Sequence, residues 1–290
     1  MLNPSSGATQ SVSLYRRLVN QGATAFAILA AILVLVPLLA IFAYLVIKGI
    51  GSVNLAFLTQ TPKPPGEAGG GMANAIVGTG LILMVASVIG LPLGIGSGIY
   101  LAEYGQNRFG DMIRFTADVL NGVPSIVIGI AVYSLIVVRQ KHFSALSGGV
   151  ALGIMMIPTI ARATEEMLLM VPNVIREAAY GLGIPKWRTT LSISLRTASA
   201  GVITGCMLAF ARVAGETAPL LFTAFGNQFW NLKLNQPTAA LSLQVYTYAI
   251  SPYDDWHKQA WAGSLILIVL IVGAVAAVRI TTSRGMMKGA

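Results

Sequence analysis

The chain has 290 residues, of which 55% are hydrophobic and 10% are charged, and its mean hydropathy is +0.74. Soluble domains carry about 25% charged residues, so the composition excludes an ordinary soluble protein. The net charge of +9 suits the basic cytoplasmic loops of a membrane protein, and no basic run with interleaved aromatic residues indicates nucleic-acid binding. The single cysteine, Cys206, excludes an intrachain disulfide and a metal site built from several cysteines.

Long apolar runs predict an all-α, polytopic membrane protein, because a helix needs roughly 20 apolar residues to cross the bilayer core. The first run begins near Ala23 and is too long for a cleaved signal peptide, so we expect a retained helix. Pro92 and several glycines interrupt the second run and predict a kink, while the third run contains Pro124. The six predicted spans are 24–47, 73–101, 112–138, 146–169, 197–222 and 262–280.

The distribution of basic residues predicts the orientation of these spans. With the N-terminus inside, Lys and Arg number twelve on the inner segments and six on the outer ones, and Arg212 lies within a span. Cytoplasmic loops collect Lys and Arg, so both termini are expected in the cytoplasm. The predicted organisation is a cytoplasmic tail at 1–22, a transmembrane domain at 23–282 and a cytoplasmic C-terminal tail at 283–290.

The polar loop at about 170–196, between the fourth and fifth spans, mixes charged and apolar residues at helical spacing. Asn173 is a suitable N-cap residue, and a short helix is expected from Val174 to Leu182. Gly183, followed by Pro185, predicts its end. A second helical run then leads into the fifth span, so the loop places two short helices where a soluble partner could dock.

This loop resembles the EAA motif of the permease subunits of bacterial ABC importers. The matching residues are Glu177, Ala178, Ala179, Gly183, Ile193 and Leu195, with Arg196 where the pattern has proline. The resemblance implies that Glu177, Ala178, Ala179 and Gly183 belong to a coupling helix that fits a groove on a separate ATPase subunit. An interfacial amphipathic helix without a partner remains the alternative.

Other segments resemble the PstA family of phosphate permease subunits, and the similarity covers nearly all of the chain after about residue 50. They are Gly69–Ala75, Gly98–Tyr104, Arg212–Ala224 and Asn227–Trp230. The resemblance implies import of inorganic phosphate across the bacterial inner membrane. It also implies a PstC-like second permease, a PstB-like ATPase dimer that binds the ATP, and a PstS-like extracytoplasmic binding protein. Phosphate and membrane lipid are the other expected contacts, and no cofactor is expected on this chain.

Arg212 and Glu216 are the predicted residues of the substrate pathway. They stand four residues apart in the fifth span, and Arg212 lies roughly 22 Å along it at about 1.5 Å per residue. Charged groups at such a depth usually face a protein interior or a water-filled cavity, and Gly215 and Pro219 favour a broken helix there. A guanidinium suits phosphate, with Glu216 as its partner in the empty pathway. A purely structural Arg–Glu pair is the alternative.

Other functions are weighed against this one. The chain has no G-x-x-x-x-G-K-[ST] phosphate loop, so it is expected to be a transport subunit rather than an enzyme. Sulfate or molybdate could replace phosphate as the cargo, and an ion-driven secondary carrier is a more distant alternative. A membrane enzyme acting on lipid would need a catalytic constellation that the sequence lacks. His142 and His257 have no clustered second ligand, so no metal site is expected.

Overall fold

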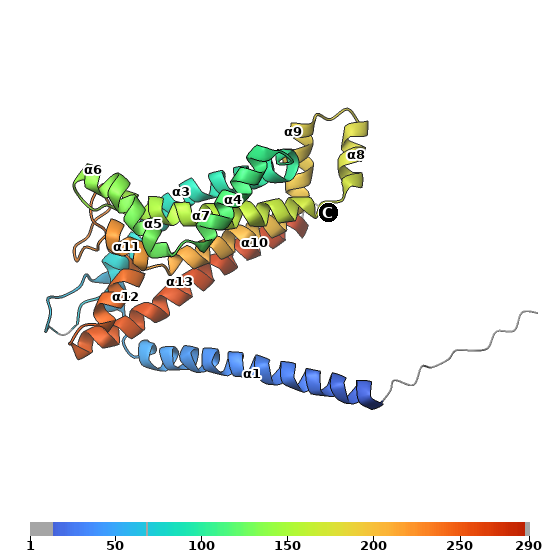
Figure 1. Cartoon of the computed structure of the whole chain (residues 1–290). Helices are drawn as coiled ribbons and strands as arrows, with labels where there is room; N and C mark the ends of the chain where they lie inside the picture. Colours follow the sequence, from blue (N-terminus) through green and yellow to red (C-terminus); the bar gives the residue numbers. More distant parts are fainter. Residues whose placement is uncertain (1–13, 68, 288–290) are drawn as a thin grey trace, which may run out of the picture. The chain divides into compact units, whose positions relative to one another are not determined.

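A computed structural model describes residues 14–67 and 69–287, and in this part of the chain it is helical apart from loops and one isolated bridge between Phe225 and Thr238 (Figure 1). The chain divides into two compact parts, up to Ile47 and from Lys48 onward, which are described separately. The first is formed by α1 (Leu14–Ile50), an apolar helix that contains the first predicted span. Residues 14–22 of the predicted tail are therefore helical, and residues 1–13 lie outside the described part.

Two long helices form the centre of the second part. They are α3 (Ala73–Tyr104) and α7 (Ala145–Leu169), which match the second and fourth predicted spans. Three glycines of α3, spaced four residues apart, face α7: a Cβ built on Gly98 would lie 2.5 Å from the Cβ of Thr164. A Cβ built on Gly90 would likewise come too close to Met156, and one built on Gly94 would come too close to Ile160. Small residues at this spacing let two helix backbones approach closely, so α3 and α7 are packed as one unit.

The predicted third span is not one helix. It is divided into α4 (Arg108–Gly122) and a second helical stretch, Ser125–Gln140, which are bent by 105°. Pro124 causes this break, because a proline lacks the backbone N–H and disfavours helical angles at the preceding residue. Val123 is accordingly extended, at φ −73° and ψ 130°. The second stretch comprises α5 (Ser125–Val132), a π-helical turn (Tyr133–Val137) and α6 (Val138–Gln140).

The predicted fifth span is also divided. The helical run that leads into it consists of α9 (Lys186–Thr189) and a π-helical turn (Thr190–Ser194), and the span itself starts as α10 (Leu195–Ala214). A short helix, α11 (Ala218–Thr223), follows the break. The two broken spans meet, because a Cβ built on Gly129 of α5 would lie 2.6 Å from the Cα of Pro219 in α11.

The remaining elements are α2 (Leu55–Thr59), α8 (Asn173–Gly181), α12 (Leu241–Ala249) and α13 (Asp254–Met287). The sixth predicted span lies within α13. Five helices of the described chain are long and apolar enough to cross a membrane, or six if the bent pair counts as one span, which is compatible with the predicted six. In Figure 1, α8 and α9 stand at one end of the second part, and α5, α6, α11 and α12 lie at the opposite end.

Candidate functional site

The predicted coupling loop is a helical hairpin formed by α8 and α9, and "the hairpin" below means residues 173–189. Helix α8 begins at Asn173 itself, after Pro172 in the cap position. The prediction that Asn173 caps the helix is therefore wrong: Pro172 is extended, at φ −58° and ψ 137°, and its carbonyl already accepts a hydrogen bond from the Ile175 N–H.

The reversal between the two helices depends on Gly183. Its φ of +76° lies in the left-handed region that residues with a Cβ rarely adopt. The Gly183 N–H donates to the Tyr180 carbonyl at 2.9 Å, and the Ile184 N–H donates to the Ala179 carbonyl at 3.1 Å. This pair of bonds is the Schellman arrangement that ends a helix at a glycine, and Pro185 follows it. The predicted end at Gly183 and Pro185 is confirmed.

The outer surface of the hairpin is apolar and exposed. Val174 is 73% exposed, Leu182 81% and Trp187 62%. Glu177 and Ala178 are also exposed, whereas Ala179 is buried and faces the rest of the chain. An apolar surface with one carboxylate, on a short helix outside the bundle, has the chemistry of a protein-docking surface.

The second predicted site lies at the break between α10 and α11. Arg212 is in the last turn of α10 and is exposed, while Glu216 lies beyond the helix end. The Ser242 hydroxyl donates to the Glu216 carbonyl oxygen at 2.9 Å and holds the break in place. The predicted broken helix is thus confirmed.

The predicted placement of Arg212 and Glu216 on one helix face is wrong, because α10 ends at Ala214 and the following residues leave the helix. Within residues 14–67 and 69–287, no ion pair joins the two side chains. The guanidinium of Arg212 has no acidic partner in this part of the chain.

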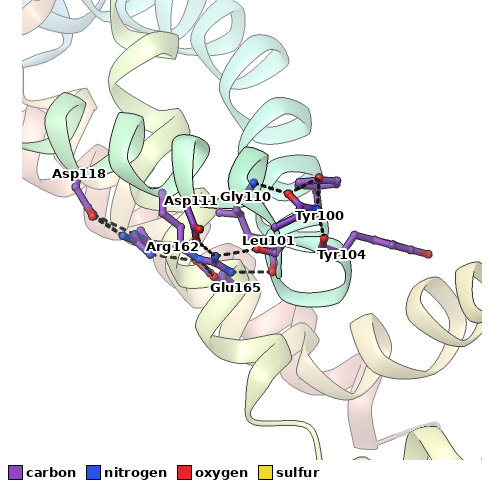
Figure 2. Close-up of polar contacts among 11 residues, drawn as sticks. Tyr100, Leu101, Tyr104, Gly110, Asp111, Asp118, Arg162 and Glu165 are labelled. Atoms are coloured by element: carbon purple, nitrogen blue, oxygen red, sulfur yellow. Dashed lines mark hydrogen bonds and ion pairs between the residues drawn. The ribbon is translucent and has the colours of Figure 1, made fainter.

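A cluster of charged side chains joins α4 to α7 (Figure 2). Arg162 binds both carboxylate oxygens of Asp118, at 2.7 and 2.6 Å, and lies 3.2 Å from Glu165. Arg114 donates to the other Glu165 oxygen at 2.7 Å and also contacts Asp111. We call these five residues the α4–α7 charge network. The Glu165 side chain is only 6% exposed, so its buried negative charge is stabilised by the two arginines.

Sequence reasoning missed most of this network. The pairs Asp111–Arg114 and Arg162–Glu165 stand three residues apart, which is a signal in the sequence. The contacts between α4 and α7 join residues more than 40 positions apart and have no such signal. Among the described residues, no group of three His, Cys, Asp or Glu side chains is arranged to hold a metal ion.

The structure brings the four predicted coupling residues together on the hairpin. Arg212 and Glu216 lie at the opposite end of the second part, next to α11 (Figure 1). The predicted docking surface and the predicted pathway residues are therefore separate, and the helices α3, α7 and α10 run between them.

Comparisons with known proteins show the family to which this chain is similar. Residues 90–284 match the family model described as "Binding-protein-dependent transport system inner membrane component". The phosphate transport system permease protein PstA of Yersinia pestis is 48% identical over 228 residues, which are 78% of this chain and 77% of that protein. The PstA protein of Xylella fastidiosa strain Temecula1 is 44% identical over 269 residues, 92% of this chain and 93% of that protein.

The fold resembles that of a solved transporter chain. A chain of the MetNI methionine ABC transporter, in an inward-facing conformation, aligns with a TM-score of 0.55 and 19% sequence identity. The alignment covers 72% of this chain and 93% of that one. At this identity the likeness concerns the fold alone.

Proposed function

This chain belongs to the family of binding-protein-dependent transport system inner membrane components, and within it to the PstA phosphate permeases, and from that premise we propose how it works. It is a transmembrane permease subunit of an ABC importer for inorganic phosphate. Its apolar helices cross the membrane, and its partners include an ATPase and a binding protein. The finer assignments below are our own proposals.

The exposed hairpin is the observation on which the mechanism rests. It presents Glu177, Ala178 and a surface that includes Val174 and Leu182 outside the bundle, as a coupling helix must if it is to enter a groove on an ATPase subunit. Gly183 fixes the reversal, so the hairpin is preformed before any partner binds. Preformed surfaces bind at a lower entropic cost than segments that must become ordered.

The assembly that we propose contains a PstC-like second permease, a PstB-like ATPase dimer and a PstS-like extracytoplasmic binding protein. ATP is bound by the ATPase dimer, and this chain binds no cofactor of its own. The complex lies in the bacterial inner membrane with the hairpin and both termini of this chain in the cytoplasm. This orientation is supported by the excess of Lys and Arg on the segments assigned to that side.

Arg212 is our proposed phosphate contact in the pathway. It is exposed on the isolated chain, at a helix break, and has no acidic partner in the described residues. An unpaired guanidinium offers a planar set of donors to an oxyanion. Glu216, two residues beyond the end of α10, contributes negative charge near the pathway rather than a direct pair with Arg212. It thereby favours release of the anion.

Purification and uptake measurements test this proposal. The tagged chain should bring with it a distinct permease and an ATPase, and cells that lack the chain should lose phosphate uptake. Sulfate and molybdate serve as competing anions in the uptake measurement. If either competes more strongly than unlabelled phosphate does, that anion and not phosphate is the cargo. Uptake without an ATP-hydrolysing companion would instead indicate an ion-driven carrier.

A charge reversal on the hairpin makes the test specific. Glu177→Arg should reduce recovery of the ATPase with the purified chain, because the exposed carboxylate faces the partner. Glu67→Arg is the matched control, since Glu67 is an exposed carboxylate in the predicted outer loop. Crosslinks that place Glu177 on the extracytoplasmic side would contradict the orientation.

A further inference from the structure

Glu103 is a buried carboxylate in an unfavourable position. It is the penultimate residue of α3, and its side chain is only 4% exposed. The C-terminal end of a helix carries partial negative charge, so an acidic side chain there is destabilising unless cations lie close to it. Burial adds to the cost of an unpaired charge. Positive charge from outside α3 must therefore compensate for the buried negative charge of Glu103.

Two cations of the hairpin supply this compensation. Arg176 of α8 lies 3.2 Å from the Glu103 carboxylate, and Lys186 of α9 donates to the Glu103 backbone carbonyl at 2.6 Å. The Lys186 ammonium also lies 4.3 Å from the ring centre of Tyr104, the last residue of α3. Both helices of the hairpin are thus tied to Glu103, and α9 also contacts Tyr104.

Arg176 extends this connection to α7. It donates to the Leu168 carbonyl at 2.6 Å, and Leu168 is the penultimate residue of α7. The Leu168 carbonyl lies in the last turn of α7 and has no partner within that helix, so Arg176 connects the last turns of α3 and α7. The Glu103–Arg176 pair therefore lies where the hairpin meets the tightly packed α3–α7 pair.

The hairpin continues directly into α10 through the π-helical turn, but its covalent link to α7 is a weak mechanical connection. Helix α7 ends at Leu169 and α8 begins at Asn173, so a short non-helical segment joins them. Such a segment can bend as a hinge. The contacts of Arg176 and Lys186 with Glu103 oppose that bending, because they fix both helices of the hairpin to the end of α3.

We infer that Glu103 is a positioning residue that fixes the hairpin to the α3–α7 pair, so that ATP-driven movement of the hairpin moves those helices instead of bending the link at residues 170–172. This inference rests on the proposed function. It assigns Glu103 a role in coupling that differs from contact with the ATPase or with phosphate.

The test compares transport with ATP hydrolysis in the same sample. The whole importer, with its binding protein, is reconstituted in vesicles with either wild-type chain or Glu103→Gln, which keeps the size of the side chain and removes its charge. We expect phosphate uptake to fall roughly tenfold while hydrolysis changes by less than about twofold, a typical range for loss of coupling. Glu103→Asp should restore part of the uptake, and Glu67→Gln should match wild type.

Two outcomes would overturn the inference: uptake and hydrolysis that fall in parallel, as for a purely structural role, or uptake that stays at the wild-type level. If Glu103→Gln does not assemble, the double variant Glu103→Gln/Arg176→Gln leaves no unpaired buried charge at the site. It should assemble and remain uncoupled, and a wild-type ratio of uptake to hydrolysis in this variant would also overturn the inference.

Failure of the proposed function would be seen separately. It would appear in the wild-type vesicles as an absence of phosphate uptake, before any variant is compared. If those vesicles import another oxyanion, the same ratio is measured with that anion.

Discussion

Two arginines at opposite ends of the bundle differ in their surroundings. Arg162, toward the hairpin, binds Asp118 through Nε and Nη2 and Glu165 through Nη1. Arg212, at the α10–α11 break, is exposed and has no acidic partner in the described residues. A guanidinium whose donors are occupied holds helices together, whereas one with free donors can bind a ligand.

The difference shows that charge and depth do not by themselves identify a pathway residue. Both arginines lie in apolar helices, and each has a glutamate three or four residues further along the sequence. Arg162 is paired with Asp118 of α4 and with Glu165 of its own helix, whereas no carboxylate in the described residues reaches Arg212. The comparison therefore predicts that Arg212 acts in transport and that the α4–α7 charge network acts in stability.

The largest effect is expected from Arg212→Gln. Loss of a charged contact to phosphate should reduce the uptake rate by about a hundredfold, with the complex still assembled. Uptake of labelled phosphate by reconstituted vesicles measures this. Arg139→Gln is the control, because Arg139 is also an exposed helical arginine without an acidic partner in the described residues. Equal uptake by both variants would show that Arg212 does not contact phosphate in the pathway.

The next largest effect is expected from Glu165→Ala. This change leaves Arg114 and Arg162 without their shared, buried carboxylate, and should lower the free energy of unfolding by about 3 kcal/mol. Thermal unfolding of the purified chain in detergent should show a lower midpoint. Uptake per assembled complex should change much less than in Arg212→Gln, and an equally large loss would mean that the network belongs to the pathway.

Arg212→Lys tests whether the shape of the cation matters. Lysine keeps the charge but loses the planar set of donors, so uptake should fall about tenfold, which corresponds to about 1.4 kcal/mol. The apparent KM for phosphate is the quantity to compare with wild type. A variant that transports normally would reduce the role of Arg212 to that of a point charge.

The smallest effect is expected from Asp118→Asn. The Asp118 side chain is 60% exposed, and exposed ion pairs contribute less than about 1 kcal/mol. Thermal stability should fall only slightly, and the KM for phosphate should stay within about twofold of wild type. If this mild change abolished uptake, the Arg162–Asp118 pair would have a role in transport and the contrast with Arg212 would fail.

Much of the architecture can be predicted from the sequence because local signals decide it. The apolar run of residues 146–169 becomes α7 with a one-residue difference at its start. Gly183 and Pro185 end the coupling helix, since the left-handed turn and the missing N–H are properties of these residues themselves. The hairpin and its exposed surface follow from such local rules.

Features that depend on distant contacts or on helix direction are not predictable in this way. Pro124 marks the third span in the sequence, but the 105° turn depends on how α5 packs against α11. The pairing of Arg212 with Glu216 assumes a continuous helix, and the helix ends between them. Glu103 carries no local sign of Arg176 or Lys186, which join it only after folding.

The glycine face of α3 affects how the packing of α3 against α7 depends on temperature. Lipid chains are as apolar as leucine side chains, so water expulsion does not hold α3 against α7 within the bilayer; close contact between the backbones at Gly90, Gly94 and Gly98 does. Hydrophobic association in water weakens on cooling, because it depends on the entropy of the solvent. A contact that does not depend on expelling water lacks that temperature dependence. The packing of α3 against α7 should therefore not weaken on cooling.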